Sequence, residues 1–171
     1  RVKRDRPLRT GVILREGAVH LALDADPVDR PALTLEAAAE AATLGTRIDR
    51  SSLDRLALSV EPARQRHGTF PWDAESRSTF ARLLLAGEPA IEVIEALDRK
   101  GVWVWLLPEW EGVRCRPQRN AYHTYTVDRH LCVAATNAAG LVSMVDRPDL
   151  LVLGTLLHDI AKGQPGDHTV V

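Results

Sequence analysis

The sequence predicts a mainly α-helical protein that begins with a small β-hairpin. Between residues 34 and 110, apolar residues recur at helical spacing and are bracketed by capping and helix-ending residues. Two further helical patterns follow near residues 128–140 and 148–160, and both carry histidine. Residues 1–30 differ, because they contain short β-capable runs and turn residues.

The hairpin is predicted from residues 11–14 and 18–23, which are β-capable and flank the short segment Arg15-Glu16-Gly17. Two such runs around a glycine-containing turn are typical of a β-hairpin. Asp24-Ala25-Asp26-Pro27 has turn chemistry and is expected to end the second strand.

Local capping signals predict the first two helices. Thr34 is expected to cap a helix that runs to Gly45, where glycine can adopt the left-handed conformation just past the helix end. Ser51-Ser52-Leu53-Asp54 resembles a capping box, which predicts a second helix that stops near Pro62.

The next two helices are also bracketed by end signals. Asp73 is expected to cap a third helix that ends at Gly87. Pro89 fits the first turn of a fourth helix, which is expected to end before Gly101.

Residues 101–107 are apolar and ambiguous between a strand and a buried helix, with Pro108 ending the run. The tryptophans nearby could form a ligand platform or pack in the core: Trp103, Trp105 and Trp110. Core packing is favoured, because aromatic side chains carry a large apolar area.

Composition narrows the classes of protein to consider. The formal net charge is −1, so nothing in the overall charge favours a nucleic acid or membrane partner. No apolar run approaches the roughly 20 residues that a membrane-spanning helix needs. Cys115 and Cys132 form neither a disulfide framework nor a metal knuckle, which favours a reducing compartment and a cytoplasmic protein. Because the only methionine is Met144, we expect a piece of a longer protein.

The dipeptide His158-Asp159 is the clearest chemical signal. On a helix that starts near residue 148, four apolar residues are expected on one side, which would place the dipeptide close to the core: Leu150, Leu153, Leu157 and Ile160. Burying two ionisable groups there is costly unless something compensates, and a divalent cation would do so. A hydrogen-bonded pair at a helix terminus is the alternative, and the dipeptide alone does not separate the two.

His130 adds a third candidate ligand. It lies in the first turn of the preceding predicted helix and 28 residues before His158. That spacing corresponds to a helix, a turn and most of a second helix, so two antiparallel helices can bring His130 to the dipeptide. Three convergent ligands with open coordination positions are typical of a hydrolytic metal site.

A histidine followed by a distant His-Asp pair resembles the HD phosphohydrolases, and two longer strings make the likeness more specific. Residues 119–130 read Arg-Asn-Ala-Tyr-His-Thr-Tyr-Thr-Val-Asp-Arg-His, and residues 158–168 read His-Asp-Ile-Ala-Lys-Gly-Gln-Pro-Gly-Asp-His. Together they resemble the HD domain of the bifunctional PII uridylyltransferase/uridylyl-removing enzymes. Pro108-Glu109-Trp110 and the helical stretch before it resemble the linker domain of that family.

The resemblance implies a division of the chain into three parts. Residues 1–30 would be a hairpin and linker after a nucleotidyltransferase domain that this sequence does not contain. Residues 31–112 would be the helical linker domain, and residues 113–171 the first part of an all-α HD domain.

The implied activity is metal-dependent hydrolysis that removes UMP, or AMP in some lineages, from a tyrosine of the signalling protein PII. The longer enzyme would also attach the nucleotide, and its ACT domains would sense glutamine. The implied metal ligands are His130, His158 and Asp159, with Mg or Mn as the expected ion and Fe or Zn as alternatives.

Further roles follow from the same resemblance. Lys162 and His168 are implied as catalytic residues, Lys162 neutralising a phosphoryl oxygen and His168 binding a second metal or the phosphate. Substrate contact or support of the ligands is implied for three residues: His123, Asp167 and Arg119.

This chain departs from the family pattern in three respects. It contains no Gly-Ser transferase motif, no ACT domain and no distant fourth aspartate ligand of the HD site. Two alternatives therefore stay open: another HD-family nucleotide phosphohydrolase, or a regulatory HD module without turnover.

Overall fold

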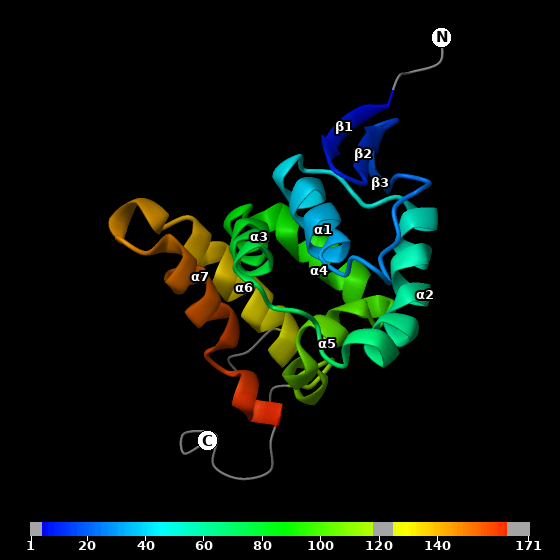
Figure 1. Cartoon of the computed structure of the whole chain (residues 1–171). Coiled ribbons are helices and arrows are strands. Elements are labelled where there is room, and N and C mark those ends of the chain that lie inside the picture. The colour runs from blue at the N-terminus through cyan, green and yellow to red at the C-terminus, as the bar shows by residue number, and fades with distance from the viewer. Residues whose placement is uncertain (1–4, 118–124, 164–171) are drawn as a thin grey trace.

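The computed structural model describes residues 5–117 and 125–163 (Figure 1). The chain starts with an antiparallel sheet of order β1-β2-β3, formed by Arg6–Arg9, Val12–Arg15 and Ala18–Leu21. The predicted hairpin corresponds to β2 and β3. Strand β1 was not predicted, because its sequence Arg-Pro-Leu-Arg is mostly exposed and has no buried alternation.

The remainder of the described chain is helical, so the expected mainly α fold with an N-terminal hairpin is confirmed. The helices occupy these ranges in order: α1 Leu33–Thr43, α2 Arg50–His67, α3 Ala74–Leu85, α4 Glu88–Arg99, α5 Val102–Leu106, η1 Pro108–Gly112, α6 Val127–Ala139, η2 Val142–Met144, α7 Pro148–Leu157 and η3 Ile160–Gly163. The ambiguous apolar run after Gly101 is thus a short helix rather than a strand.

Three of the expected helix ends are wrong. Thr34 does not cap α1: it lies inside the helix and is buried. Helix α2 is capped by Asp49, whose carboxylate accepts hydrogen bonds from the backbone of Ser51 and Ser52. This helix continues past Pro62 to His67.

Contacts along the second half of α2 explain why proline does not end it. Ala63, the residue after Pro62, is completely buried. His67 Nε2 lies 2.8 Å from the carbonyl oxygen of Val28, which anchors the last turn. These tertiary contacts offset the one backbone hydrogen bond that Pro62 cannot make.

The other two capping signals are confirmed. Asp73 accepts a hydrogen bond from the backbone N–H of Ser76 at 2.7 Å and so caps α3. Helix α4 has its proline in the first turn and ends at Arg99, before Gly101.

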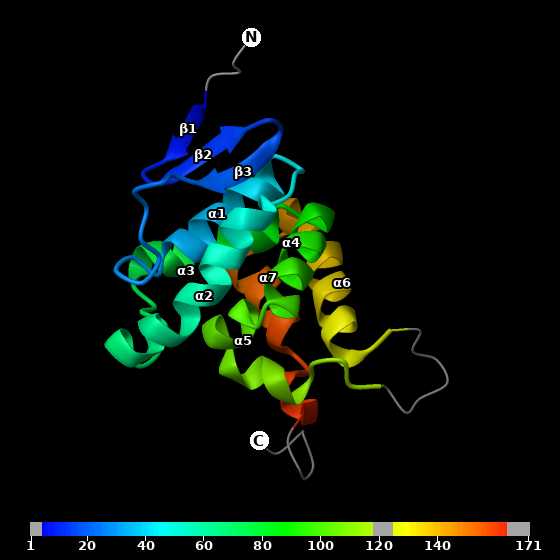
Figure 2. The ribbon, with the colours of Figure 1, turned by 90° about the vertical axis from the view of Figure 1, so that its right-hand side faces the viewer.

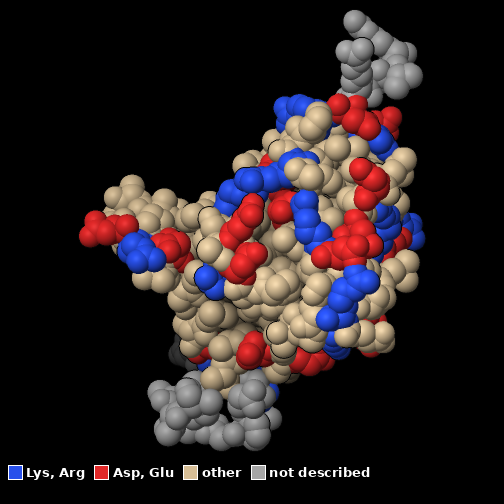
Figure 3. All heavy atoms as spheres, in the orientation of Figure 1, with Lys and Arg blue, Asp and Glu red and all other residues tan. Residues whose placement is uncertain are grey.

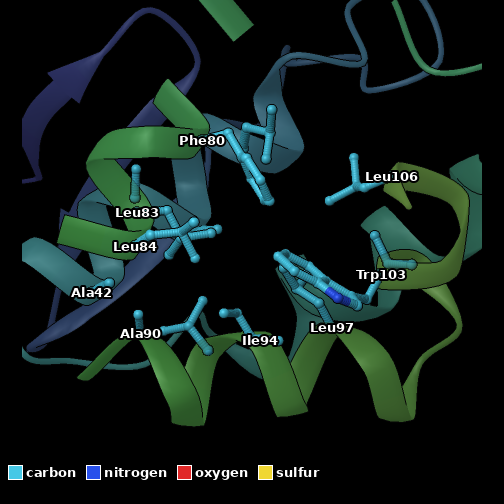
Figure 4. Close-up of a cluster of buried hydrophobic side chains, with 14 of the residues drawn as sticks. Ala42, Phe80, Leu83, Leu84, Ala90, Ile94, Leu97, Trp103 and Leu106 are labelled. Carbon is cyan, nitrogen blue, oxygen red and sulfur yellow. The ribbon is translucent and has the colours of Figure 1, made fainter. Parts of the chain in front are cut away.

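The core lies among α1, α3, α4 and α5 (Figure 4). Phe80, Leu83 and Leu84 of α3 face Ala90, Ile94 and Leu97 of α4 in this view, and Trp103 closes one end of the cluster. The rings of Trp103 and Trp110 meet edge to face with centroids 5.9 Å apart. The tryptophans at 103, 105 and 110 are all buried, in agreement with the packing interpretation.

Helices α6 and α7 pack on each other and against α3 and α4 (Figure 2). Leu131 of α6 and Leu156 of α7 are fully buried in the same apolar cluster as the tryptophans. The expected core face of α7 is partly wrong. Leu150 and Leu157 are exposed, whereas Val152 and Leu156 are buried. The helix is apolar on nearly all sides, so spacing alone could not identify the buried face.

Acidic and basic side chains alternate over the face shown in Figure 3, so neither sign dominates that side. Among residues 5–117 and 125–163, no helix combines the length and hydropathy needed to cross a bilayer.

Candidate metal centre

Three candidate ligands come from the start of α6 and the end of α7. Helix α6 begins at Val127, which places His130 in its first turn. Pro148 starts α7, and the helix ends after ten residues with His158 as its C-terminal cap. Asp159 follows directly, and Lys162 lies one turn later in η3.

The three side chains lie close together, as the sequence spacing predicts. Their ligand atoms are all within 4.8 Å of one another. His158 Nε2 is 3.1 Å from Asp159 Oδ2, and His130 Nε2 is 3.9 Å from the same oxygen. Among the described residues, this is the one group of three or more His, Cys, Asp or Glu side chains close enough to bind a metal ion.

The exposure of the group differs from expectation. His158 is exposed at the surface, with 41% of its side chain accessible, whereas Asp159 is 16% accessible. The expectation that both residues lie close to the core is therefore wrong for His158. An exposed imidazole beside a half-buried carboxylate leaves one side of the group open to solvent.

A backbone contact orients His158. Its Nδ1 lies 2.7 Å from the carbonyl oxygen of Thr155. A carbonyl oxygen can only accept a hydrogen bond, so Nδ1 donates this one. The contact turns Nε2 toward Asp159, and Nε2 is therefore the ring nitrogen that could bind a metal ion.

Asp159 is the anionic centre of the group. Burial raises the pKa of this carboxyl, but the hydrogen bond from Lys162 and the charges of His158, Lys162 and His130 outweigh burial and hold the pKa below its ordinary value. Lys162 Nζ lies 2.6 Å from Asp159 Oδ2. The carboxylate is therefore ionised at neutral pH.

The donor set fits a divalent ion. A tetrahedral ion with bonds of about 2.0–2.2 Å holds its ligand atoms roughly 3.3–3.6 Å apart. The ligand atoms here lie within 4.8 Å of one another, so the side chains would have to draw closer to share one ion. Two imidazole nitrogens and one carboxylate oxygen form a mixed set that suits Mn, Fe, Mg or Zn.

Four of the sequence-predicted site residues lie outside the described residues: Arg119, His123, Asp167 and His168. Their implied roles stay predictions.

Asp128 was not among the predicted site residues. Its Oδ2 accepts a hydrogen bond from the backbone N–H of Cys115 at 2.8 Å, and Val127 N–H donates to the carbonyl of Arg116. These contacts fix the start of α6, and therefore His130, to the segment after η1. An acidic residue in the first turn of a helix was the available signal, but its partner is 13 residues away in sequence.

A pocket of about 310 Å³ lies between α4 and α6, away from the histidines. Its lining includes Asp98, Trp110 and Cys132. Burial raises the pKa of the Cys132 thiol to about 12, so this cysteine stays protonated and unreactive.

The sequence is similar to known proteins over nearly its whole length. It is 49% identical over 164 residues to the bifunctional uridylyltransferase/uridylyl-removing enzyme of Streptomyces coelicolor, a match that covers 96% of this chain. Its identity to the enzyme of the same name is 46% in Mycobacterium tuberculosis and 36% in Corynebacterium glutamicum, in each case over 166 residues.

These matches cover only 19% to 23% of the relatives' own length, so the chain spans about a fifth of them. No protein-family profile and no solved structure matches the chain.

Proposed function

The chain corresponds to one segment of the bifunctional uridylyltransferase/uridylyl-removing enzymes, and from this we propose that it contributes to the nucleotide-removing activity of such an enzyme. The reaction would be metal-dependent hydrolysis of the phosphodiester between UMP and a tyrosine of PII. This proposal includes PII as the protein partner, Mg or Mn as the ion and a cytoplasmic setting.

One observation carries the proposal: His130, His158 and Asp159 converge within 4.8 Å from two different helices. A purely structural His-Asp contact at a helix end would not need a second histidine from α6. The backbone contact that orients His158 and the ionised state of Asp159 both suit metal binding.

The chemistry requires activated water, neutralised charge at phosphorus and a leaving phenolate. A divalent ion at this group would supply Lewis acidity for the first two needs. The oxygen of water forms the new bond to phosphorus, the bond from phosphorus to the tyrosine oxygen breaks, and a proton reaches that oxygen. The products are UMP and unmodified tyrosine.

The residues of the chain would divide this work. His130, His158 and Asp159 would hold the ion. Lys162 would supply a positive charge to a phosphoryl oxygen as the transition state forms. The open side of the group, beside exposed His158, leaves room for the modified tyrosine of a partner protein.

The test uses the full-length enzyme that carries this segment. Replacing His158 and Asp159 together with alanine is expected to lower the rate of nucleotide release from modified PII by at least about 100-fold, because removal of two ligands should eliminate ion binding. Nucleotide attachment should continue, since the chain holds no transferase motif. A time course of modified PII measures both activities.

A second His-Asp pair in the chain offers a matched control. His20 Nδ1 lies 3.5 Å from Asp49 Oδ2. The variant His20→Ala/Asp49→Asn removes this pair and keeps a good helix cap at position 49. It should retain nucleotide release within about twofold. Full release activity in the His158→Ala/Asp159→Ala variant would refute the proposal.

A further inference from the structure

The ammonium group of Lys162 contacts Asp159 Oδ2, the same carboxylate oxygen that His158 and His130 approach. Its Nζ is 2.6 Å from Asp159 Oδ2, closer than His158 Nε2 at 3.1 Å or His130 Nε2 at 3.9 Å. The lysine and aspartate are three residues apart, so η3 brings them together locally. An ion held by the three ligands would need the same oxygen.

We propose that Lys162 and the divalent ion compete for Asp159 Oδ2, so that Lys162 lowers the metal affinity and is released when the ion binds. This inference rests on the proposed metal site. It adds that Lys162 has two positions, one on Asp159 without the ion and one directed away from it with the ion bound.

Charge balance supports the exchange. Without an ion, the ammonium of Lys162 neutralises Asp159, whose side chain is only 16% accessible. With an ion on Oδ2, the ammonium and a divalent cation would share one oxygen, and two positive charges so close together would repel each other. The lysine side chain has four methylene groups, so it can turn the ammonium elsewhere without moving the backbone.

The exchange links metal loading to substrate recognition. A lysine paired with Asp159 is not available to a phosphate, whereas a released lysine is a mobile cation at the edge of the site. Its side chain is 28% accessible, so the released ammonium can turn outward to an incoming phosphoryl oxygen.

The first test measures Mn²⁺ binding to this 171-residue chain by titration calorimetry. Lys162→Met should bind Mn²⁺ about tenfold more tightly than the unmodified chain, because a charge-assisted contact and a repulsion are both removed. Lys162→Arg should stay within about twofold, since arginine keeps the charge and the carboxylate contact.

Lys100 provides the matched control. Its Nζ lies 2.5 Å from Asp54 Oδ1, so it forms the same kind of contact with a carboxylate that is not part of the candidate metal centre. Lys100→Met should leave Mn²⁺ affinity unchanged within about twofold, because neither Lys100 nor its partner is a candidate ligand.

The second test follows the released ammonium directly. The chain has three lysines, and acetylation by an N-hydroxysuccinimide ester followed by mass spectrometry resolves each one. Saturating Mn²⁺ should increase the acetylation rate of Lys162 several-fold and leave that of Lys100 unchanged.

The outcomes separate this inference from the proposed function. The exchange would be overturned if Lys162→Met bound Mn²⁺ no more tightly than the unmodified chain does, or if the acetylation rate of Lys162 were the same with and without Mn²⁺. Neither result would contradict the metal site itself. Absence of Mn²⁺ binding by both the unmodified chain and Lys162→Met would overturn a metal site formed by these three ligands alone, and the exchange with it.

Discussion

Helix α6 separates two half-buried aspartates that each have a basic partner. On the α4 side, Asp98 Oδ2 accepts a hydrogen bond from Arg114 at 3.0 Å. On the α7 side, Asp159 accepts one from Lys162 at 2.6 Å. The two side chains are almost equally accessible, at 14% and 16%. Nevertheless the pKa of Asp98 is raised above its ordinary value and that of Asp159 is lowered below it.

The neighbours of the two carboxyl groups account for the difference. Burial is the largest influence at both and raises the pKa. Asp98 has Arg114 to oppose burial, but Asp128 and Glu111 add to it. Among the described residues, no acidic group is a main influence on Asp159, and the neighbours that lower its pKa are Lys162, His158 and His130.

This contrast distinguishes a structural ion pair from a candidate site. On the α4 side, charges are matched: Glu95 pairs with Arg129 as Asp98 pairs with Arg114. On the α7 side, one carboxylate is approached by three basic side chains, those of Lys162, His158 and His130. Because the side chains of Asp98 and Asp159 are almost equally accessible, the accessible fraction alone would not have identified Asp159 as part of the candidate metal centre.

The largest effect is expected from a substitution in the core of α6, because this helix supports the surroundings of both aspartates. Leu131 lies on α6, the helix that packs against both α4 and α7, and it is fully buried. Leu131→Ala should lower the free energy of unfolding by about 2–5 kcal/mol, through lost burial and the cavity left behind. Urea denaturation followed by circular dichroism measures this change. Leu58→Ala is the control, because Leu58 is 77% exposed and its loss should cost under about 0.5 kcal/mol.

The second prediction sharpens the comparison, because Asp98 and Asp159 form a matched pair. Asp159→Ala should weaken Mn²⁺ binding to the chain by at least about 100-fold, since even loss of an outer partner of a metal ligand costs about 10–100-fold. Asp98→Ala should leave Mn²⁺ affinity within about twofold. Titration calorimetry on both variants measures the two affinities. Equal losses of Mn²⁺ affinity would contradict the prediction, because they would show that Asp159 has no special role in binding the ion.

The sequence predicted best where the deciding contacts are local. Asp73 caps α3 and Pro89 begins α4 because both signals act within one helical turn. The meeting of His130 with His158 was predictable from the length of two antiparallel helices. The choice of Asp49 over Ser51 as a cap was not, because adjacent acceptors compete for the same backbone donors.

Other features depend on tertiary contacts that no local pattern records. Helix α2 continues past Pro62 because its later residues are held by the rest of the fold. Leu150 and Leu157 were expected on the buried side, but an all-apolar helix does not reveal which face is covered. The contact of Lys162 with Asp159 was missed because the resemblance implied a substrate role for the lysine.

The smallest expected effect is a difference in pH dependence between Asp98→Asn and Asp159→Asn. The pKa of Asp159 in the folded chain lies below the ordinary 3.8, so its ionised form stabilises the fold above that value, and this contribution is lost as the pH falls through the folded pKa. The pKa of Asp98 lies above 3.8, so its contribution is present below 3.8 and is lost as the pH rises through the folded pKa.

Asparagine does not titrate, so each variant isolates the effect of one carboxyl group on stability. Melting temperatures from about pH 3 to pH 6 should therefore diverge in opposite directions. The advantage of the unmodified chain over Asp159→Asn should shrink toward low pH, and its advantage over Asp98→Asn should shrink toward high pH. Parallel profiles for the two variants would mean that the neighbours of the two aspartates do not distinguish them, and the contrast across α6 would lose its electrostatic basis.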